Sequence, residues 1–358
     1  MAYIRLDSQA FFHNLTAITN ELSKATYPTT PNLALVLKDN AYGHGLKQMA
    51  HLAKEANIES VFVKNYEEAI SIAQHFRIIT ALYGEIPPNA PSNIWASIPS
   101  LQALQSCITE HKNAHQTRNI ELKIDIGMHR NGITINELDS ALAQLENAEH
   151  IRLAGVFGHN GYGDNDNENF FTSVQAFREV KDKVCKWCEV RNDPIPRFHS
   201  LSTSGALRLC LHNANVNDLG DLVRIGIGAY GYHTSELTLP ISLVPVASLY
   251  AQKISSLYLK KGDKIGYGGV SVVQENGVFS TYDVGYGDGL LRVDSRQNLT
   301  CASGEKILPV MSMDCFSCQS EKEEICVFSD VSEWAKEFGA IPYMILTHLS
   351  PTLKRVVV

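Results

Sequence analysis

One lysine in this chain stands where an amine could do chemistry. Lys38 follows the apolar run Leu33–Val36, and Tyr42 and two glycines come directly after it. A lysine beside an apolar wall can have a lowered pKa and act as a nucleophile or base. The segment therefore predicts covalent or acid–base chemistry at Lys38. Taken alone, it fits a surface lysine before an ordinary turn about equally well.

Two further motifs follow apolar runs with side chains that suit anions and planar ligands. Arg130 comes shortly after the run Ile120–Ile124, where a guanidinium group could bind a carboxylate or another oxygen anion. His159 follows Phe157 and offers a ring that could stack on a planar ligand. A solvated arginine and a structural histidine are the competing interpretations.

Hydroxyl groups and glycines near residues 203 and 226 favour a phosphate site. Thr203 and Ser204 precede a predicted helix, and Arg224, Gly226 and Ile227 belong to a later apolar run. Hydroxyls and free amides at a helix N-terminus bind phosphate well. The spacing leaves open which of the two hydroxyls would make that contact.

The segments that must position these residues alternate between short apolar runs and amphipathic stretches. Eight such units in ~195 residues average ~24 residues each, which is typical of a (β/α)8 TIM-type barrel, although a doubly wound open sheet is the rival architecture. In such a barrel the carboxyl ends of the strands build the active site. The predicted strands are Leu33–Val36, Ser60–Val63, Ile78–Tyr83, Ile94–Ile98, Ile120–Ile124, Leu153–Phe157, Phe198–Leu201 and Val223–Ile227.

The sequence pattern changes after about residue 238. Short strand-like runs such as Val246–Tyr258 and Val278–Val284, separated by glycines and prolines, indicate a mostly β domain. The opening run Tyr3–Leu6 could add a strand to it. We therefore predict an α/β barrel over residues 1–238 and a β C-terminal domain over residues 239–358.

Composition narrows the function classes. A formal net charge of −7 argues against a general nucleic-acid binder and against docking on an anionic membrane. No apolar stretch reaches the ~18 residues of a transmembrane helix, and the N-terminus does not resemble a signal peptide. These patterns predict a cytoplasmic protein, in which the eight cysteines would be reduced thiols.

Two cysteine pairs have the spacing of zinc ligands, Cys185 with Cys188 and Cys315 with Cys318. The first pair lies in a stretch with helical periodicity, and the second falls in the other predicted domain. Small buried hydrophobic side chains explain them more simply, so no metal is predicted.

Taken together and in order, the motifs resemble those of the alanine racemase family, and the resemblance covers nearly the whole chain. In its bacterial two-domain form this family has a barrel that binds pyridoxal phosphate, followed by a β domain. The segments that carry the resemblance are 38–45, 123–130, 223–227, 266–269, 285–289 and 312–314.

The resemblance implies a homodimeric racemase that interconverts L- and D-alanine and supplies D-alanine for peptidoglycan. Lys38 would hold pyridoxal phosphate as a Schiff base and serve as one of two bases, with Tyr267 reaching in from the partner subunit as the other. Arg224 would face the pyridine nitrogen, and Arg130 and Met313 would bind the substrate carboxylate. The other expected cofactor contacts are Tyr42, Arg130, His159, Thr203 or Ser204, Gly226 and Ile227, and the residues that shape the site are Lys123, Tyr286, Arg292 and Asp314.

Several departures from the family pattern leave the substrate range open. Asp39 replaces a small residue, Val310 replaces an arginine near the entrance, and the tail 347–351 lacks a tyrosine that often lines the site. Lys123 resembles a lysine that is carbamylated in some members. The remaining alternatives are a broader racemase that accepts serine, a decarboxylase of basic amino acids, and a non-catalytic carrier of pyridoxal phosphate. Decarboxylases of this fold pair the pyridine nitrogen with a carboxylate, so Arg224 counts against them.

Overall fold

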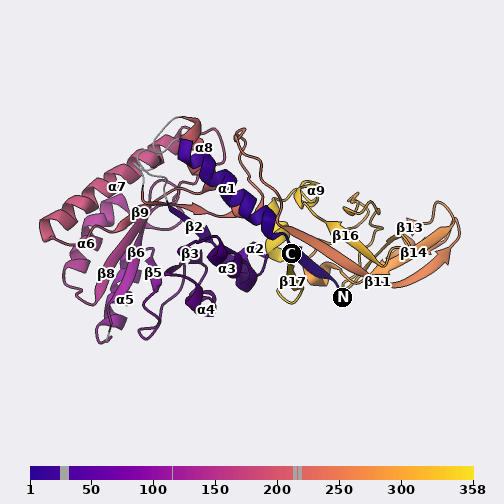
Figure 1. The fold of residues 1–358 in the computed structure, drawn as a ribbon, viewed down its shortest axis with the longest axis horizontal. Coiled ribbons are helices and arrows are strands. Elements are labelled where there is room, and N and C mark those ends of the chain that lie inside the picture. The colour runs from indigo at the N-terminus through magenta and orange to yellow at the C-terminus, as the bar shows by residue number, and fades with distance from the viewer. Residues whose placement is uncertain (25–31, 115, 213–215, 217–219) are drawn as a thin grey trace.

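The computed structural model describes residues 1–24, 32–114, 116–212, 216 and 220–358. Its first part is a ring of eight parallel strands (Figure 1). The sheet order places β10 next to β2 and β9 at the other end, and a parallel bridge between Ser202 and Arg224 nearly closes the ring. The strands are β2 (Asn32–Val36), β3 (Ser60–Val63), β4 (Ile78–Ala81), β5 (Ile94–Ile98), β6 (Arg118–Asp125), β8 (Ile151–Phe157), β9 (Arg197–His199) and β10 (Leu222–Ile225).

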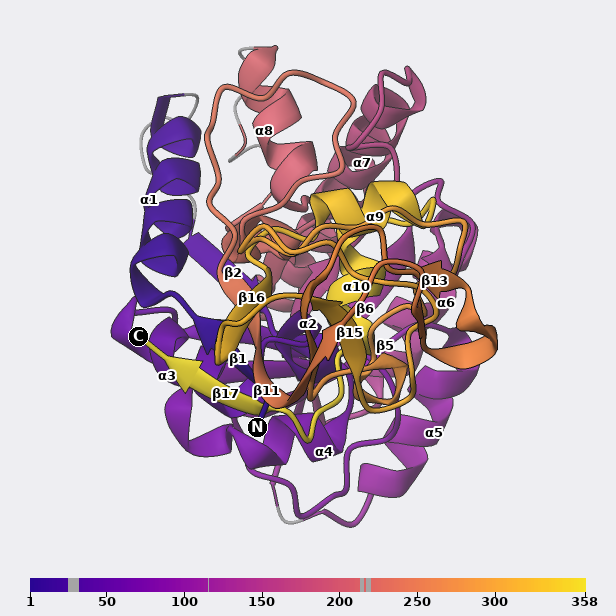
Figure 2. The same ribbon diagram turned by 90° about the vertical axis from the view of Figure 1, so that its right-hand side faces the viewer.

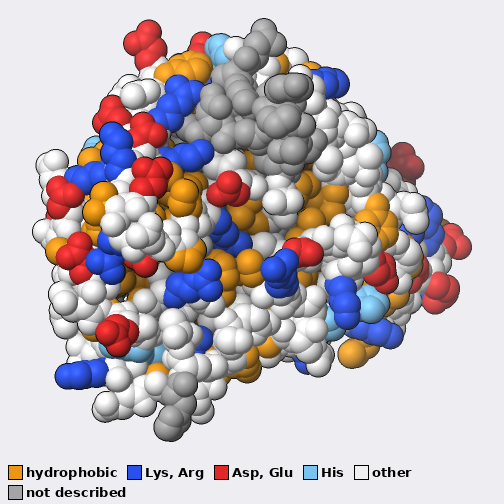
Figure 3. All heavy atoms as spheres, turned by 60° about the vertical axis from the view of Figure 1, so that its left-hand side comes forward, with side chains coloured by type: hydrophobic (Ala, Val, Ile, Leu, Met, Phe, Trp, Pro, Cys, Tyr) orange, Lys and Arg blue, Asp and Glu red, His pale blue; other side chains and the backbone are white. Residues whose placement is uncertain are grey.

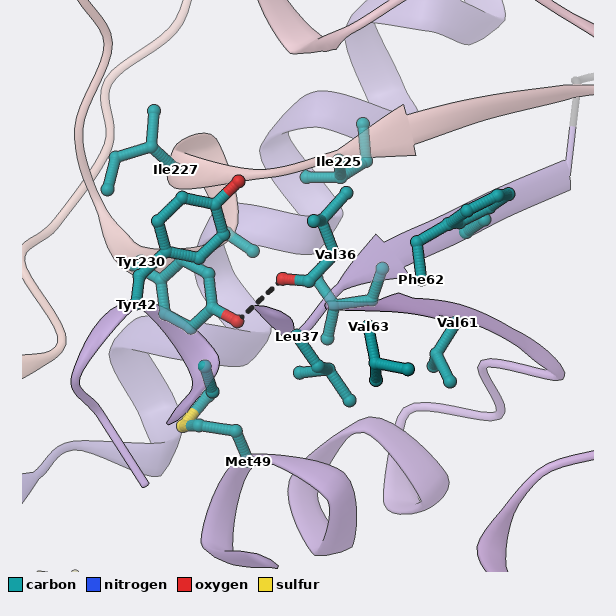
Figure 4. Close-up of a cluster of buried hydrophobic side chains, with 14 of the residues drawn as sticks. Val36, Leu37, Tyr42, Met49, Val61, Phe62, Val63, Ile225, Ile227 and Tyr230 are labelled. Atoms are coloured by element: carbon teal, nitrogen blue, oxygen red, sulfur yellow. Dashed lines mark hydrogen bonds between the residues drawn. The ribbon is translucent and has the colours of Figure 1, made fainter. Parts of the chain in front are cut away.

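The central barrel strands are buried on both faces, which explains the continuous apolar character of short runs such as β3. Strand β3 is buried at each of its four residues. Figure 4 shows Val61 and Val63 directed toward the helix that carries Met49, whereas Phe62 points the opposite way, into the barrel. The period-2 alternation of a strand thus supplies the barrel interior and the helix-facing layer from one short run.

Helices surround the barrel, and three of them begin with a side chain that caps the first turn. Asn65, Ser100 and Ser202 each accept a hydrogen bond from a backbone N–H three residues on. Residues 82–93, between β4 and β5, contain no helix. The helices of this part are α1 (Ser8–Lys24), α2 (Lys38–Tyr42), α3 (Leu46–Glu55), α4 (Tyr66–Ser71), α5 (Leu101–His111), α6 (Leu138–Glu146), α7 (Asn169–Arg191) and α8 (Thr203–Leu211).

The second part is a mostly β domain built on one long strand, β11 (Ala247–Leu259). β11 pairs antiparallel with β1 (Tyr3–Leu6), β14 and β16, so the first residues of the chain belong to the sheet of its last third. The other elements are β12 (Lys264–Ile265), β13 (Ser271–Val272), β14 (Gly277–Tyr282), β15 (Phe316–Gln319), β16 (Glu324–Phe328), α9 (Ser332–Glu337), α10 (Pro342–His348) and β17 (Lys354–Val357).

These observations confirm the predicted fold, a (β/α)8 barrel followed by a mostly β domain. The boundary at residue 238 stays a prediction. Helix α10, which the sequence pattern did not reveal, packs against α2 at the carboxyl ends of the barrel strands. Figures 1 and 2 show that the rest of the β domain extends away from the barrel on this side.

The opposite side of the barrel carries acidic and basic side chains interspersed over the part of the surface that is described (Figure 3). Among the described residues, no helix is long and apolar enough to cross a membrane. No group of three or more His, Cys, Asp or Glu side chains in that part of the chain could hold a metal ion.

Candidate active site

A cavity of about 300 Å³ opens at the carboxyl ends of the barrel strands. We call it the barrel cavity, and it brings together every barrel residue predicted to bind the cofactor or shape the site. Four cationic side chains are among them, whereas Asp164 is the carboxylate in its lining. A positive cavity of this size suits an anionic ligand. The predicted residues that line it are Lys38, Tyr42, Lys123, Arg130, His159, Thr203, Ser204, Arg224, Gly226 and Ile227.

Lys38 opens a short left-handed turn and not the ordinary turn of the competing interpretation. Residues 39–42 have φ values between 51° and 55°. This conformation costs L-residues roughly 1–2 kcal/mol each. The backbone N–H of Asn40 donates to Glu68 at 2.9 Å, and the Asn40 side chain accepts from Leu46 N–H at 2.8 Å. These contacts hold the strained turn in place, and such strain is typical of functional sites.

The turn directs Tyr42 into an aromatic cluster at the wall of the barrel cavity. The ring of Tyr42 lies 5.2 Å from that of Tyr230 and 5.7 Å from that of Tyr343. Tyr230 in turn donates a hydrogen bond to the carbonyl of Val36 at 2.9 Å (Figure 4). Burial, reinforced by Tyr343 and Asp39, raises the pKa of Tyr42 well above its usual value. Its hydroxyl is therefore a neutral hydrogen-bond donor.

The start of α8 and the segment after β10 form the part of the barrel cavity that suits a phosphate. The Thr203 hydroxyl is buried and has no hydrogen-bond partner among the described residues. A Cβ added at Gly226 would lie 3.1 Å from the Tyr42 hydroxyl, so the glycine keeps space beside that hydroxyl. A buried hydroxyl without a partner is costly and calls for a ligand acceptor.

Arg224 is held on two sides at the bottom of the barrel cavity. One guanidinium nitrogen donates to Nδ1 of His199, and the other donates to the carbonyl of Gly158 at 2.8 Å. Burial lowers the pKa of Arg224 to about 10, which leaves it protonated at neutral pH. His159 lies beside it and is half-buried. Burial and the nearby cations, Arg224 first among them, lower the pKa of His159 to about 3, so its ring is neutral.

Strand β6 and the loop after it present two further cations, Lys123 and Arg130. Asp125 accepts hydrogen bonds from the N–H groups of Gly127 and His129, both at 3.0 Å, and so shapes the turn that carries Arg130. Lys123 is buried and donates to the side chain of Asn131. Burial and the charge of Arg130, with smaller effects of other cations, lower the pKa of Lys123 to about 8.

The site residues predicted in the β domain lie elsewhere. None of them lines the barrel cavity of this chain, and they form an exposed group that we call the β-domain cluster. Tyr267 is 64% exposed, and Met313 is 54% exposed. The guanidinium carbon of Arg292 lies 5.8 Å from the ring centre of Tyr286. The β-domain cluster consists of Tyr267, Tyr286, Arg292, Met313 and Asp314.

Backbone contacts join the loops of the β-domain cluster. The N–H of Gly287 donates to the carbonyl of Met313 at 2.7 Å. A Cβ on Gly285 would lie 2.3 Å from that same carbonyl oxygen, so only glycine allows this approach. The tail 347–351 braces the same region, since Ser350 N–H donates to the carbonyl of Asp288 at 2.8 Å. Position 351 holds a proline and contributes no aromatic ring.

The structure also explains one departure and reveals lining residues that the motifs did not indicate. Asp39 forms an ion pair of 2.7 Å with Lys64 at the rim of the turn. Tyr343, on α10, and Tyr232 line the barrel cavity, yet neither follows a recognisable motif. Only the packing of α10 against α2 brings Tyr343 there, and no local sequence pattern encodes that packing.

Comparisons with known proteins agree with this geometry. Residues 6–234 match the family model described as alanine racemase, N-terminal domain, and residues 246–357 match the one described as alanine racemase, C-terminal domain. An alanine racemase of Campylobacter curvus is 37% identical over 355 residues, which cover 99% of each chain. One of Campylobacter jejuni is 36% identical over 358 residues and the full length of both.

Solved structures share the fold at lower identity. An alanine racemase of Bacillus anthracis with bound L-Ala-P has a TM-score of 0.85 at 24% identity, covering 100% of this chain and 95% of that one. One of Bartonella henselae with covalently bound pyridoxal phosphate has a TM-score of 0.79 at 20% identity, covering 100% and 99%. A histidine racemase of Leuconostoc mesenteroides has a TM-score of 0.84 at 22% identity, covering 100% and 98%. The shared fold thus occurs with more than one substrate.

Proposed function

The chain belongs to the alanine racemase family of pyridoxal-phosphate-dependent enzymes, and we propose that it interconverts L- and D-alanine with Lys38 and Tyr267 as its two bases. The observation that carries the proposal is the barrel cavity, in which Lys38 lies with three further cations at the ends of parallel strands. The fold does not by itself decide which amino acid is the substrate, because a pocket discriminates between substrates that differ by one methylene by only about 1–3 kcal/mol.

The residues present fit pyridoxal phosphate. Thr203 has a buried hydroxyl that lacks a partner among the described residues, and the glycine at 226 keeps space beside the Tyr42 hydroxyl. We assign the phosphate to the hydroxyl groups of Thr203 and Tyr42 and to the backbone of Gly226 and Ile227. Ser204 is the alternative to Thr203. His159 is neutral and suited to stacking on the ring, while Lys38 would hold the cofactor covalently.

The cofactor, when bound, withdraws electrons from the α-carbon of the amino acid and so weakens the bond to its hydrogen. Racemisation then requires one base on each face of that carbon. In our proposal the Nζ atom of Lys38 takes or returns the proton on one face, and the hydroxyl oxygen of Tyr267 does so on the other.

Arg224 distinguishes racemisation from competing chemistry. It is a permanent hydrogen-bond donor held by His199 and Gly158. A donor that keeps its own protons leaves the pyridine nitrogen unprotonated, which weakens the electron withdrawal and should suppress transamination. Arg130, aided by the backbone N–H of Met313, would bind the substrate carboxylate through charge-assisted hydrogen bonds. The charge of Lys123 contributes to the electrostatic potential around Arg130.

We propose that the working form is a homodimer in which the β-domain cluster of one copy completes the barrel cavity of the other. The support is that Tyr267 and Met313 are more than half exposed in the single chain and do not line its own cavity. Tyr286, Arg292 and Asp314 would then shape the entrance from the second copy. A single chain would bind the cofactor but lack its second base.

The cellular role follows from the reaction. D-Alanine is a building block of peptidoglycan, and we propose that the protein supplies it in the cytoplasm. The eight cysteines are all free thiols, which is typical of proteins in a reducing compartment.

The test of the reaction is conversion of L-alanine to D-alanine by purified protein with pyridoxal phosphate, with L-serine measured in parallel. Activity on alanine should disappear in Lys38→Ala, a loss of about 10⁴-fold or more. Equal or faster conversion of serine would make the protein a broader racemase. Bound cofactor without conversion of either amino acid would contradict the proposal and favour a carrier.

A further inference from the structure

A row of polar side chains crosses the interior of the barrel and ends at the barrel cavity. It begins with Arg197 on β9, whose Nε donates to Oε1 of Glu121 on β6 at 2.6 Å. Nε2 of His199, also on β9, lies 3.2 Å from the same oxygen. Nδ1 of His199 then meets the guanidinium group of Arg224 on β10. Only Arg224 among these four lines the cavity.

The surrounding strands are shaped to hold this row. A Cβ added at Gly155 on β8 would lie 2.3 Å from Oε1 of Glu121, so the glycine makes room for the carboxylate. The register between β6 and β8 shifts at Ile120 and Glu121. Irregular pairing of this kind re-aims a side chain. The local backbone of β6 and β8 is therefore adapted to accommodate the Glu121 carboxylate.

Two phenylalanines fix the plane of the His199 ring. Phe157 stacks on it with ring centres 5.1 Å apart and planes inclined by 13°, and Phe62 meets it edge-on at 5.2 Å. The ring has no exposed surface. Its freedom is thus reduced to one choice, which of its two nitrogens carries the proton.

The neighbours of His199 settle that choice. Burial lowers the pKa of His199 to about 3 against the opposing effect of Glu121, so the ring is neutral and has one N–H group. Burial alone would raise the pKa of Glu121, but Arg197 and His199 outweigh it and leave the pKa far below its usual value. An ionised carboxylate only accepts hydrogen bonds and a guanidinium group only donates them. Nε2 must therefore carry the proton, and Nδ1 must accept from Arg224.

We propose that Glu121 is a positioning residue for the racemase reaction, which fixes His199 in its Nε2–H form so that Nδ1 holds Arg224 where it would face the pyridine nitrogen of the cofactor. Arg197 keeps Glu121 charged and correctly turned, through further hydrogen bonds to Ser60 at 2.8 Å and Thr80 at 3.1 Å. This inference rests on the proposed function, because Arg224 matters only if it faces the pyridine nitrogen.

A contribution to stability does not explain why the barrel interior holds this row of polar side chains. Buried ion pairs can often be replaced by apolar residues with no loss of stability, because desolvation offsets their attraction. The second oxygen of Glu121, Oε2, is buried and has no partner among the described residues. The barrel keeps this unfavourable arrangement, and the row leads to the one arginine that lines the cavity from β10.

The experiment begins with the protein free of cofactor and substrate. We would record ¹⁵N NMR spectra of histidine-labelled protein and assign the His199 signals by their loss in His199→Gln. The wild-type protein should show one form, with a proton on Nε2 and an acceptor nitrogen at Nδ1. In Glu121→Gln the uncharged amide no longer enforces that form, and the Nδ1 signal should move toward an average of the two forms.

The same variant should affect the loaded enzyme. By analogy with residues that orient a ligand histidine, kcat for alanine should fall about 10–100-fold and the cofactor should dissociate faster, while KM changes by less than about twofold. The matched control is Glu305→Gln. Glu305 is a buried carboxylate in the β domain, paired with Lys322 at 2.6 Å and remote from the row. It should leave the His199 signals, cofactor dissociation and kcat unchanged.

A double variant separates positioning from packing. The double variant Glu121→Leu with Arg197→Leu removes both buried charges together. Its melting temperature should therefore be close to that of the wild-type protein. If kcat stays low in this stable double variant, Glu121 acts on Arg224 as proposed. Recovery of kcat together with stability, or His199 signals that do not change in Glu121→Gln, would overturn the proposal. If the wild-type protein does not racemise alanine, the proposed function fails, whereas the spectra without cofactor still decide whether Glu121 fixes His199.

Discussion

The barrel cavity and the β-domain cluster hold the two groups of predicted site residues in opposite states. In the barrel cavity, Arg224 and Lys123 are buried and hydrogen-bonded to other side chains or to the backbone. The buried hydroxyl of Thr203 has no partner among the described residues. In the β-domain cluster, Tyr267 and Met313 are largely exposed and do not line the barrel cavity of their own chain. The first group is organised by the fold of one chain. The second has a defined backbone but lacks the surface that it would act on.

This contrast indicates that the two regions have different functions. Cofactor binding depends on the barrel, and the second base depends on assembly. Changes in the β-domain cluster should therefore alter turnover without altering cofactor affinity, whereas changes in the barrel cavity should alter cofactor affinity or stability.

The largest effect is expected at Tyr267. In Tyr267→Phe the ring stays but the hydroxyl is lost, and removal of one general base should lower kcat about 10²–10⁴-fold. Cofactor affinity should stay within twofold of the wild-type value, since Tyr267 does not line the barrel cavity. Tyr258→Phe is the control, because Tyr258 is 66% exposed on the same domain but lies on β11, outside the cluster. A similar loss in both variants would refute the special role of Tyr267.

The next effect concerns Lys123 and stability. Its pKa is lowered from 10.5 to about 8 in the folded protein, chiefly by burial. Between pH 8 and 10.5 the unfolded chain binds more protons at this site, so the free energy of unfolding of cofactor-free protein should rise with pH through that window. Lys123→Met should thus be more stable by on the order of 3 kcal/mol below pH 8, and the difference should vanish near pH 10.5.

Urea unfolding of cofactor-free wild-type and Lys123→Met protein at several pH values measures this difference, with Lys47→Met as an exposed-lysine control. A difference that does not depend on pH would contradict the assigned shift. If added bicarbonate is enough to abolish the difference in stability between wild-type and Lys123→Met protein, the amine of Lys123 is carbamylated, as it is in some members of the family.

Thr203 should show opposite effects on stability and binding. Thr203→Val removes a buried hydroxyl that has no partner, so cofactor-free protein should gain about 1 kcal/mol. The bound phosphate would lose a charge-assisted hydrogen bond, and the dissociation constant of the cofactor should rise about 10–100-fold. Fluorescence titration of the cofactor and thermal unfolding measure the two effects. Ser204→Ala, tested in parallel, reveals which hydroxyl binds the phosphate; a larger effect there would reverse the assignment.

The smallest effect is expected at Asp39, on the rim of the barrel cavity. Its ion pair with Lys64 is partly exposed, with side chains 35% and 54% accessible. Pairs of this kind contribute about 0–1 kcal/mol. Asp39→Ala should lower the free energy of unfolding by less than about 1 kcal/mol, less at high salt, and leave kcat unchanged. A large loss of activity would mean that the left-handed turn depends on this pair.

The sequence predicted the barrel and the residues of its cavity because the carboxyl ends of parallel strands meet on one side. Once Lys38, Arg130, Thr203 and Arg224 were assigned to strand ends, their convergence followed from the fold. The β-domain cluster depended on resemblance to the family, since short loops such as 266–269 carry no periodic signal. Its roles remain predictions.

Other features could not be predicted locally. Ala41 has a φ of 52°, although alanine does not favour the left-handed region, and tertiary contacts impose that turn. Tyr343 reaches the barrel cavity only through the docking of α10. Glu121 and Arg197 look like solvent-facing residues in a strand pattern, whereas they face each other inside the barrel. Each depends on partners distant in sequence.

Mixed dimers distinguish an active site shared by two copies from one built by a single chain. Lys38→Ala and Tyr267→Phe subunits, each inactive as a homodimer, would carry different affinity tags, be expressed together, and be purified as the mixed dimer. One of its two sites would combine the intact Lys38 of one copy with the intact Tyr267 of the other. We predict about half of the wild-type alanine racemisation rate per dimer. A mixed dimer as inactive as its parents would contradict a shared site.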